Sequence, residues 1–183
     1  SSGQVTVDVP AAAGTNTLTF PAATGNVITN KTAGTIIQIV NFTTGASATG
    51  TTQMVGDDTI PQNDEGDEYM TLAVTPTNSS NKLIINVRAN VIHTGTAGAH
   101  YGALFQDSTA NALATAWAAK NATANNPTML VIDHYMTAGT TSETTFKFRS
   151  GISVSGTTTF NGVTGSRFFG GSFASSITIT EVA

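Results

Sequence analysis

The stretch Lys82-Leu-Ile-Ile-Asn-Val-Arg-Ala-Asn-Val-Ile92 is the longest run of strand-forming residues in the chain. Ile and Val dominate it, and these β-branched residues fit the pleated surface of a strand better than the surface of a helix. A turn-forming sequence, Pro76-Thr-Asn-Ser-Ser-Asn81, comes directly before this run, and the alternating run Glu68-Tyr-Met-Thr-Leu-Ala-Val74 comes before the turn. This order of strand, turn and strand predicts a β-protein.

Shorter runs of the same kind recur along the chain, separated by turn-forming residues. We expect strands over residues 35–42, 68–74, 82–92, 99–106, 128–136, 144–149, 157–160 and 176–182. The first, Thr35-Ile-Ile-Gln-Ile-Val-Asn-Phe42, is apolar enough to be buried on both faces. Eight or more strands without a convincing helix predict a sandwich, a barrel or a jelly roll.

The segment 112–119 fits two structures. Its alanines favour a helix, which Asp107 or Ser108 could cap. However, Thr115 and Trp117 would share one face of a strand. We favour the strand, paired with residues 101–105.

The chain has few charged residues and many small polar residues, chiefly Thr, Ser and Asn. Charged residues make up 10% of the 183 residues, against roughly 25% in ordinary soluble domains. The net charge is −4, and the seven basic residues are scattered, which argues against a nucleic-acid partner. The chain has no cysteine, so it has no disulfide and no thiolate metal site. No apolar run approaches the ~20 residues of a membrane span, and we expect no membrane insertion.

The N-terminal residues differ from the rest of the chain in that they contain a short repeat with Pro, Ala and Gly. The sequences Val9-Pro-Ala-Ala-Ala-Gly14 and Phe20-Pro-Ala-Ala-Thr-Gly25 form a weak repeat of short strands that end at Pro and Gly. Such units suit a shaft in which several chains wrap together, but an ordinary pair of short strands explains them equally well. We therefore divide the chain into a shaft-like or anchoring segment at 1–34 and a β head domain at 35–183.

An acidic segment at 57–68 holds six of the eleven carboxylates. Clustered carboxylates can bind a hard cation such as calcium through their oxygens, although the spacing does not match an EF-hand loop. The alternative is a solvated loop that keeps a strand edge from pairing with another chain. The candidate metal ligands are Asp57, Asp58, Asp64, Glu65, Asp67 and Glu68.

No constellation of catalytic residues is visible. His93, His100 and His134 have no short-spaced partner, and we interpret them as structural or surface residues. Asp133 and His134 are neighbours in an expected strand, so they should point to opposite faces. Tyr101, Trp117 and Tyr135 could each stack on a sugar if exposed, but we expect the single tryptophan to pack in the core. We therefore expect no enzyme, no catalytic residue and no cofactor other than candidate calcium.

Three stretches resemble the C-terminal module of bacteriophage tail-fibre and other virion fibre proteins. The first runs from Val9-Pro-Ala-Ala-Ala-Gly to Phe-Pro-Ala-Ala-Thr-Gly25. The second runs from Asp58-Thr-Ile-Pro-Gln-Asn-Asp-Glu-Gly66 to Leu72-Ala-Val-Thr-Pro-Thr-Asn-Ser-Ser-Asn-Lys-Leu83. The third joins Leu104-Phe-Gln-Asp-Ser-Thr-Ala-Asn-Ala-Leu113 to His134-Tyr-Met-Thr-Ala-Gly-Thr-Thr-Ser-Glu-Thr-Thr-Phe-Lys-Phe-Arg149 and Arg167-Phe-Phe-Gly-Gly171.

The resemblance implies a homotrimer with an antiparallel jelly-roll head, similar to the tumour-necrosis-factor class, on an extracellular virion. It implies that the head binds a bacterial surface glycan or protein during adsorption, and that the chain contacts other virion proteins. Polar loops at 43–53, 94–99 and 121–127 are the candidate contact regions. The alternative function is a structural or decoration protein of the virion without receptor contact. An enzyme acting on surface polysaccharide is the third hypothesis, and no motif supports it.

Overall fold

Alternating apolar and polar residues form antiparallel strands throughout the computed structural model, which describes residues 33–183 except 97 and 120–122. Eight strands of six residues or more build the body. They are β1 (Ile36–Thr44), β3 (Asp67–Val74), β4 (Lys82–His93), β5 (Ala99–Gln106), β6 (Ala114–Ala119), β7 (Pro127–Thr137), β8 (Thr144–Ile152) and β12 (Ser175–Val182). The shorter elements are β2 (Ala48–Gly50), β9 (Thr158–Phe160), β10 (Gly162–Val163), β11 (Ser166–Arg167) and the 3-10 turn η1 (Phe169–Gly171).

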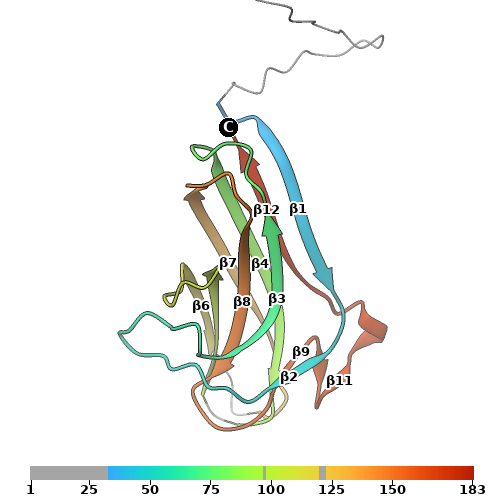
Figure 1. Ribbon diagram of the computed structural model, residues 1–183. Coiled ribbons are helices and arrows are strands. Elements are labelled where there is room, and N and C mark those ends of the chain that lie inside the picture. The colour runs from blue at the N-terminus through green and yellow to red at the C-terminus, as the bar shows by residue number, and fades with distance from the viewer. Residues whose placement is uncertain (1–32, 97, 120–122) are drawn as a thin grey trace, which may run out of the picture.

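The long strands form two layers (Figure 1). One sheet has the order β1-β12-β4-β7, and β9 and β2 extend it beside the last residues of β4. The other sheet has the order β3-β8-β5-β6. The chain crosses between the layers at every connection of the long strands except the one joining β5 and β6. This strand order is that of a jelly roll, so the predicted antiparallel jelly-roll sandwich is confirmed.

The core lies between the two sheets and follows the alternation of the sequence. On β4, Leu83, Ile85 and Val87 are fully buried, and they meet the buried rings of Phe146 and Phe148 on β8 within one cluster. The side chains of the intervening β4 residues point to the opposite face of the sheet. The stretch 82–92 therefore supplies the centre of the core.

Three expectations about individual segments have different outcomes. The segment 114–119 is a strand paired with β5, as favoured. The expectation that residues 35–42 are buried on both faces is wrong, because β1 is an edge strand that pairs only with β12, and Ile36 and Ile39 are 58% and 59% exposed. The expected shaft-like segment at 1–34 falls on residues that, apart from 33 and 34, lie outside the described part of the chain.

Both ends of the described chain meet at one end of the sandwich (Figure 1). The amide of Gly34 donates to the carbonyl of Ala183 over 2.9 Å, and the amide of Ala183 donates to the carbonyl of Thr35 over 2.9 Å. The described residues of the connections that follow β1, β4, β6 and β8 lie at the opposite end. Among the residues that the structure describes, no helix is long and apolar enough to cross a membrane.

Candidate functional site

The connection formed by residues 51–66 covers part of the outer face of the β3-β8-β5-β6 sheet. Its Met54 is fully buried against Ala103 and Phe105, which point outward from β5. A small second core therefore holds the connection on the sheet, as is common beneath long loops.

Beside this second core the connection leaves a groove of about 370 Å³. Tyr101 on β5 and Trp117 on β6 are cross-strand partners and line the groove together. Val55, Asp57 and Thr59 line it from the connection. Two aromatic residues and one carboxylate thus line a single groove.

Trp117 contradicts the expectation that it packs in the core, because its side chain is 68% exposed. Ala114, Ala116 and Ala118 are the β6 residues that pack against the core. Side chains alternate between the two faces of a strand, so the residues between these alanines point outward. The small alanines face inward and the large indole faces the groove.

Gly56 sets how closely the connection approaches Tyr101. A Cβ atom at Gly56 would lie 2.3 Å from the phenol oxygen of Tyr101, which is closer than non-bonded atoms can approach. Any side chain at residue 56 would therefore displace the phenol ring of Tyr101. The connection therefore packs directly against the Tyr101 ring beside the groove.

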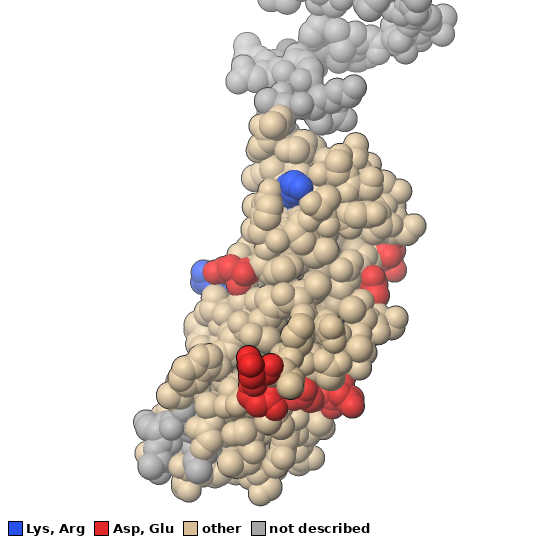
Figure 2. Space-filling model, turned by 90° about the vertical axis from the view of Figure 1, so that its left-hand side faces the viewer, with Lys and Arg blue, Asp and Glu red and all other residues tan. Residues whose placement is uncertain are grey.

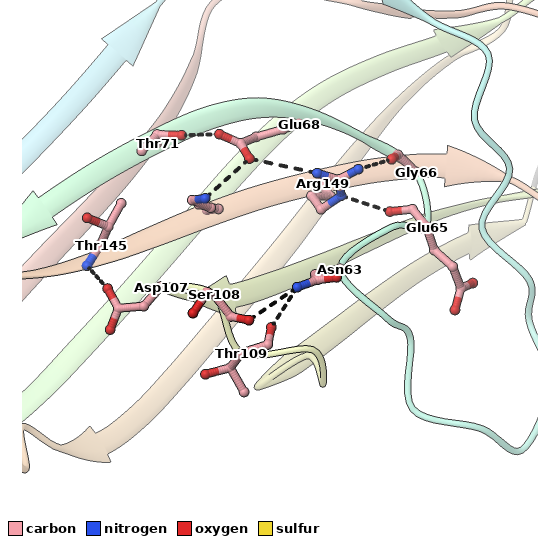
Figure 3. Close-up of polar contacts among 11 residues, drawn as sticks. Asn63, Glu65, Gly66, Glu68, Thr71, Asp107, Ser108, Thr109, Thr145 and Arg149 are labelled. Atoms are coloured by element: carbon pink, nitrogen blue, oxygen red, sulfur yellow. Dashed lines mark hydrogen bonds and ion pairs between the residues drawn. The ribbon is translucent and has the colours of Figure 1, made fainter.

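Glu65 holds the connection in shape from within. Its Oε2 accepts a hydrogen bond from the Val55 amide and its Oε1 accepts one from the Gln62 amide, both over 3.0 Å. Arg149 on β8 donates from Nε to the Glu65 carbonyl over 2.9 Å and from Nη2 to the Gly66 carbonyl over 2.6 Å (Figure 3). Hydrogen bonds to charged groups are among the stronger ones in proteins. The wall of the groove is therefore anchored at both of its ends.

Asp57 is held in place by Thr59. Its Oδ1 accepts hydrogen bonds from the side-chain hydroxyl and the backbone amide of Thr59. These bonds, the side-chain bond first, hold the pKa of the Asp57 carboxyl below its usual value. Asp57 is therefore a fixed anionic hydrogen-bond acceptor on the rim of the groove.

The six candidate carboxylates of the acidic segment occupy separate positions. Asp67 binds the amide and hydroxyl of Thr52, and Glu68 binds Thr71 and forms ion pairs with Lys147 and Arg149 (Figure 3). Asp58 and Asp64 are exposed. Among the described residues, no three His, Cys, Asp or Glu side chains gather where they could hold a metal ion.

Acidic side chains nevertheless cover more of this side of the surface than basic side chains do. Figure 2 shows Asp and Glu gathered on the face that carries the connection, without Lys or Arg beside the lower group. The electrostatic potential around the groove is therefore negative, which disfavours anionic ligands.

The histidines divide into two sets. His93 and His100 are fully buried, and their rings meet edge to face with centroids 6.4 Å apart. His134 lies on β7 opposite Ile85, and burial lowers its pKa. Asp133 accepts a hydrogen bond from Asn86 over 2.6 Å and, by strand alternation, lies on the other face from His134, as expected.

A second exposed surface is the outward face of the β1-β12-β4-β7 sheet. One cross-strand row of this face holds Ile39, Thr180, Ile84 and Tyr135 in register. Ile39 and Tyr135 are 59% and 63% exposed, and Met129 on β7 is 60% exposed. Apolar side chains spread across an open sheet are typical of surfaces that associate with another protein.

Sequence reasoning named three residues of the groove, Asp57, Tyr101 and Trp117, but not their arrangement. It named the acidic segment and the exposed aromatics as separate candidates, and the structure brings Asp57, Tyr101 and Trp117 to one groove. It missed Glu65 as the anchor of the connection. The sequence signal for this role is weak, because a carboxylate that binds backbone amides of its own loop cannot be distinguished in the sequence from any other acidic loop residue.

No protein-family model and no curated protein matches the sequence. Among solved structures, an Eiger TNF from S. frugiperda is 6% identical, with 79% of this chain and 93% of that chain covered and a TM-score of 0.46. Latent PorU from Porphyromonas gingivalis is 10% identical, with coverage of 83% and 13% and a TM-score of 0.37. The VP2 subviral particle of infectious bursal disease virus is 11% identical, with coverage of 80% and 40% and a TM-score of 0.36. These likenesses are remote, and the fold assignment rests on the strand order described above.

Proposed function

We propose that the chain is the head of a homotrimeric bacteriophage fibre that binds a receptor on the bacterial surface. The observation that carries this proposal is the separation of Gly34 and Ala183 from the connections that follow β1, β4, β6 and β8. Gly34 and Thr35 are hydrogen-bonded to Ala183 at one end of the sandwich, and the described residues of the connections after β1, β4, β6 and β8 occupy the other. This arrangement suits a domain attached at one end and free to contact a partner at the other.

Self-association is supported by the outward face of the β1-β12-β4-β7 sheet. Its long strands carry only three charged residues on that face, namely Lys82, Arg88 and Asp133. Burying its exposed apolar side chains against other copies would stabilise a cysteine-free domain by the hydrophobic effect. A closed ring of three copies would give each head the same environment.

Binding rather than catalysis is supported by the content of the groove. Glycoside hydrolysis ordinarily uses two carboxyl groups on either side of the scissile bond. Asp57 is the single carboxylate among the described residues that line the groove. We therefore propose that the chain recognises its receptor without cleaving it.

Adsorption to cells tests the proposal. Fluorescently labelled protein should bind a restricted set of bacterial strains and should compete with phage adsorption on those strains. Three copies per head should make the binding of trimers much tighter than that of a single domain. If the labelled protein instead binds purified virions and no cells across a broad strain panel, the receptor-binding proposal is wrong and a structural role in the virion is correct.

A further inference from the structure

We infer that the groove between the 51–66 connection and strands β5 and β6 binds a neutral sugar ring stacked on Trp117. The inference rests on the proposed function, because it names the ligand class of a receptor-binding head. It is carried by the shape, the aromatic surface and the polar rim of one groove.

Trp117 belongs to neither hydrophobic core, whereas Tyr101 packs partly against the second core. Trp117 is 68% exposed, and the alanines on the other face of β6 already contact the core. Tyr101 lies directly across the strand pair, and both residues line the groove. The C–H faces of a sugar ring are apolar and pack flat on an aromatic ring, which removes apolar surface of both partners from water.

The polar rim matches the hydroxyl groups of a sugar. Asp57 presents a carboxylate of which only Oδ1 takes part in the described hydrogen bonds, so Oδ2 can accept from a ligand hydroxyl. Thr115 offers a further hydroxyl beside the rings, and it is a cross-strand neighbour of Ala103. A groove with a few placed polar groups and an aromatic lining is the usual form of a small-ligand site.

The connection is ordered before any ligand arrives. Glu65 binds the amides of Val55 and Gln62, and the Gly56 backbone lies against the phenol of Tyr101. A preformed wall loses little conformational entropy when a ligand binds. The groove can therefore bind a small neutral ring that offers only a few contacts.

The charge of the surroundings selects among sugars. Asp57 and the exposed Asp58 lie on the connection, and Figure 2 shows an acidic surface there. A uronic or sialic acid would place its carboxylate near these charges and would be repelled. A cation would be attracted, but the hydroxyl-rich lining of Thr59 and Thr115 favours a neutral polyol.

Tryptophan fluorescence gives a direct test because Trp117 is the only tryptophan of the chain. Methyl α-D-glucopyranoside, methyl β-D-galactopyranoside and N-acetylglucosamine are titrated into the assembled protein, with glucuronic acid and choline chloride as comparisons. We expect a saturable change of emission with at least one neutral sugar and none with glucuronic acid. A response to choline alone would overturn the inference in favour of a cation site, and no response to any neutral sugar would also overturn it.

Calorimetry on variants separates the groove from the rest of the surface. Trp117→Ala and Asp57→Ala should each weaken binding of the responding sugar by at least about tenfold. Tyr135→Ala removes an exposed aromatic ring from the other sheet and should leave the affinity unchanged. Equal affinities in all three variants would contradict a site at Trp117.

Two further readouts keep this inference distinct from the proposed function. If Trp117 resists acrylamide quenching in the assembled protein and becomes accessible on dissociation, a second copy covers the groove and the sugar site is wrong. If the protein binds cells and Trp117→Ala binds them equally well, the groove inference fails and the receptor-binding proposal stands. If sugars bind but no cells are bound, the proposed function fails and the groove stands.

Discussion

Trp117 on β6 lies opposite Tyr101 on β5 in the antiparallel register, and both rings line the same groove on the outer face of their sheet. The pairing follows from the hairpin that joins the two strands. The neighbouring connection, held by Glu65, forms the facing wall. The groove therefore depends on one strand pair and one loop, and each can be tested separately.

Truncation of Trp117 should barely affect stability, whereas truncation of a core ring should be costly. Trp117 is 68% exposed and Phe148 is fully buried between the sheets. We expect Phe148→Ala to lower the free energy of unfolding by about 3–5 kcal/mol. We expect Trp117→Ala to change it by less than about 0.5 kcal/mol. Urea denaturation at a fixed protein concentration measures both, and equal losses would show that Trp117 is packed in the assembled protein.

Glu65→Ala should loosen the wall of the groove. The amides of Val55 and Gln62 lose the carboxylate that accepts their hydrogen bonds, and we expect a loss of about 1–2 kcal/mol in stability. Hydrogen exchange at these two amides should become faster, while amides of β4 keep their rates. Asp64→Ala is the matched control, because Asp64 is an exposed neighbour. Unchanged exchange at Val55 and Gln62 in Glu65→Ala would rule out the anchoring role.

Glu181 makes the stability of the domain depend on pH in the acidic range. It is fully buried on β12, where it accepts hydrogen bonds from Gln38, Thr77 and Asn81. Burial acts to raise the pKa of Glu181, but these hydrogen bonds outweigh burial and hold the pKa below the usual 4.5. The unfolded chain therefore takes up the proton first as the pH falls. The contribution of Glu181 is fully present above about pH 4.5 and is lost as the pH falls through the lower pKa of the folded protein.

Glu181→Gln tests this account. The variant replaces one carboxylate oxygen by an amide NH2 group, which is itself a donor and cannot accept hydrogen bonds from the neighbouring donors. We therefore expect the free energy of unfolding to fall by about 2–3 kcal/mol at pH 7. The dependence of stability on pH below 4.5 should be weaker in the variant than in the wild type. Thermal denaturation between pH 7 and pH 3 measures both effects. Glu143→Gln, in an exposed turn, should leave stability at pH 7 unchanged. An acid dependence that stays the same in Glu181→Gln would assign it to other groups.

Tyr135→Arg should separate the copies without unfolding them. Tyr135 is 63% exposed on the outward face of the β1-β12-β4-β7 sheet, so the single domain tolerates a charge there. A charge buried between copies without a partner is strongly unfavourable. We expect a smaller particle with an unchanged circular dichroism spectrum. Ser142→Arg, in the exposed turn between β7 and β8, should leave the particle size unchanged.

The strands could be predicted from the sequence because their signals are local. The run 82–92 alternates around Ile and Val, and the structure has β4 over Lys82–His93. The burial of β1 could not be predicted in this way. Ile36 and Ile39 look like residues of a central strand, and only the pairing with β12 shows that β1 is at an edge.

The groove required information that the local sequence does not hold. Trp117 is exposed because the inward face of β6 already meets the core through alanines, and this depends on the position of the second sheet. Glu181 is separated by 100 residues or more from Thr77 and Asn81, to which it binds. Contacts of this kind follow from the strand order, which no single segment encodes.

The number of chains in the assembled particle tests the central claim most directly. Multi-angle light scattering in dilute solution reports the mass of the particle independently of its shape. For a homotrimeric fibre head we expect three times the chain mass of 18.7 kDa. A particle of one chain mass, stable across dilution, would contradict the account.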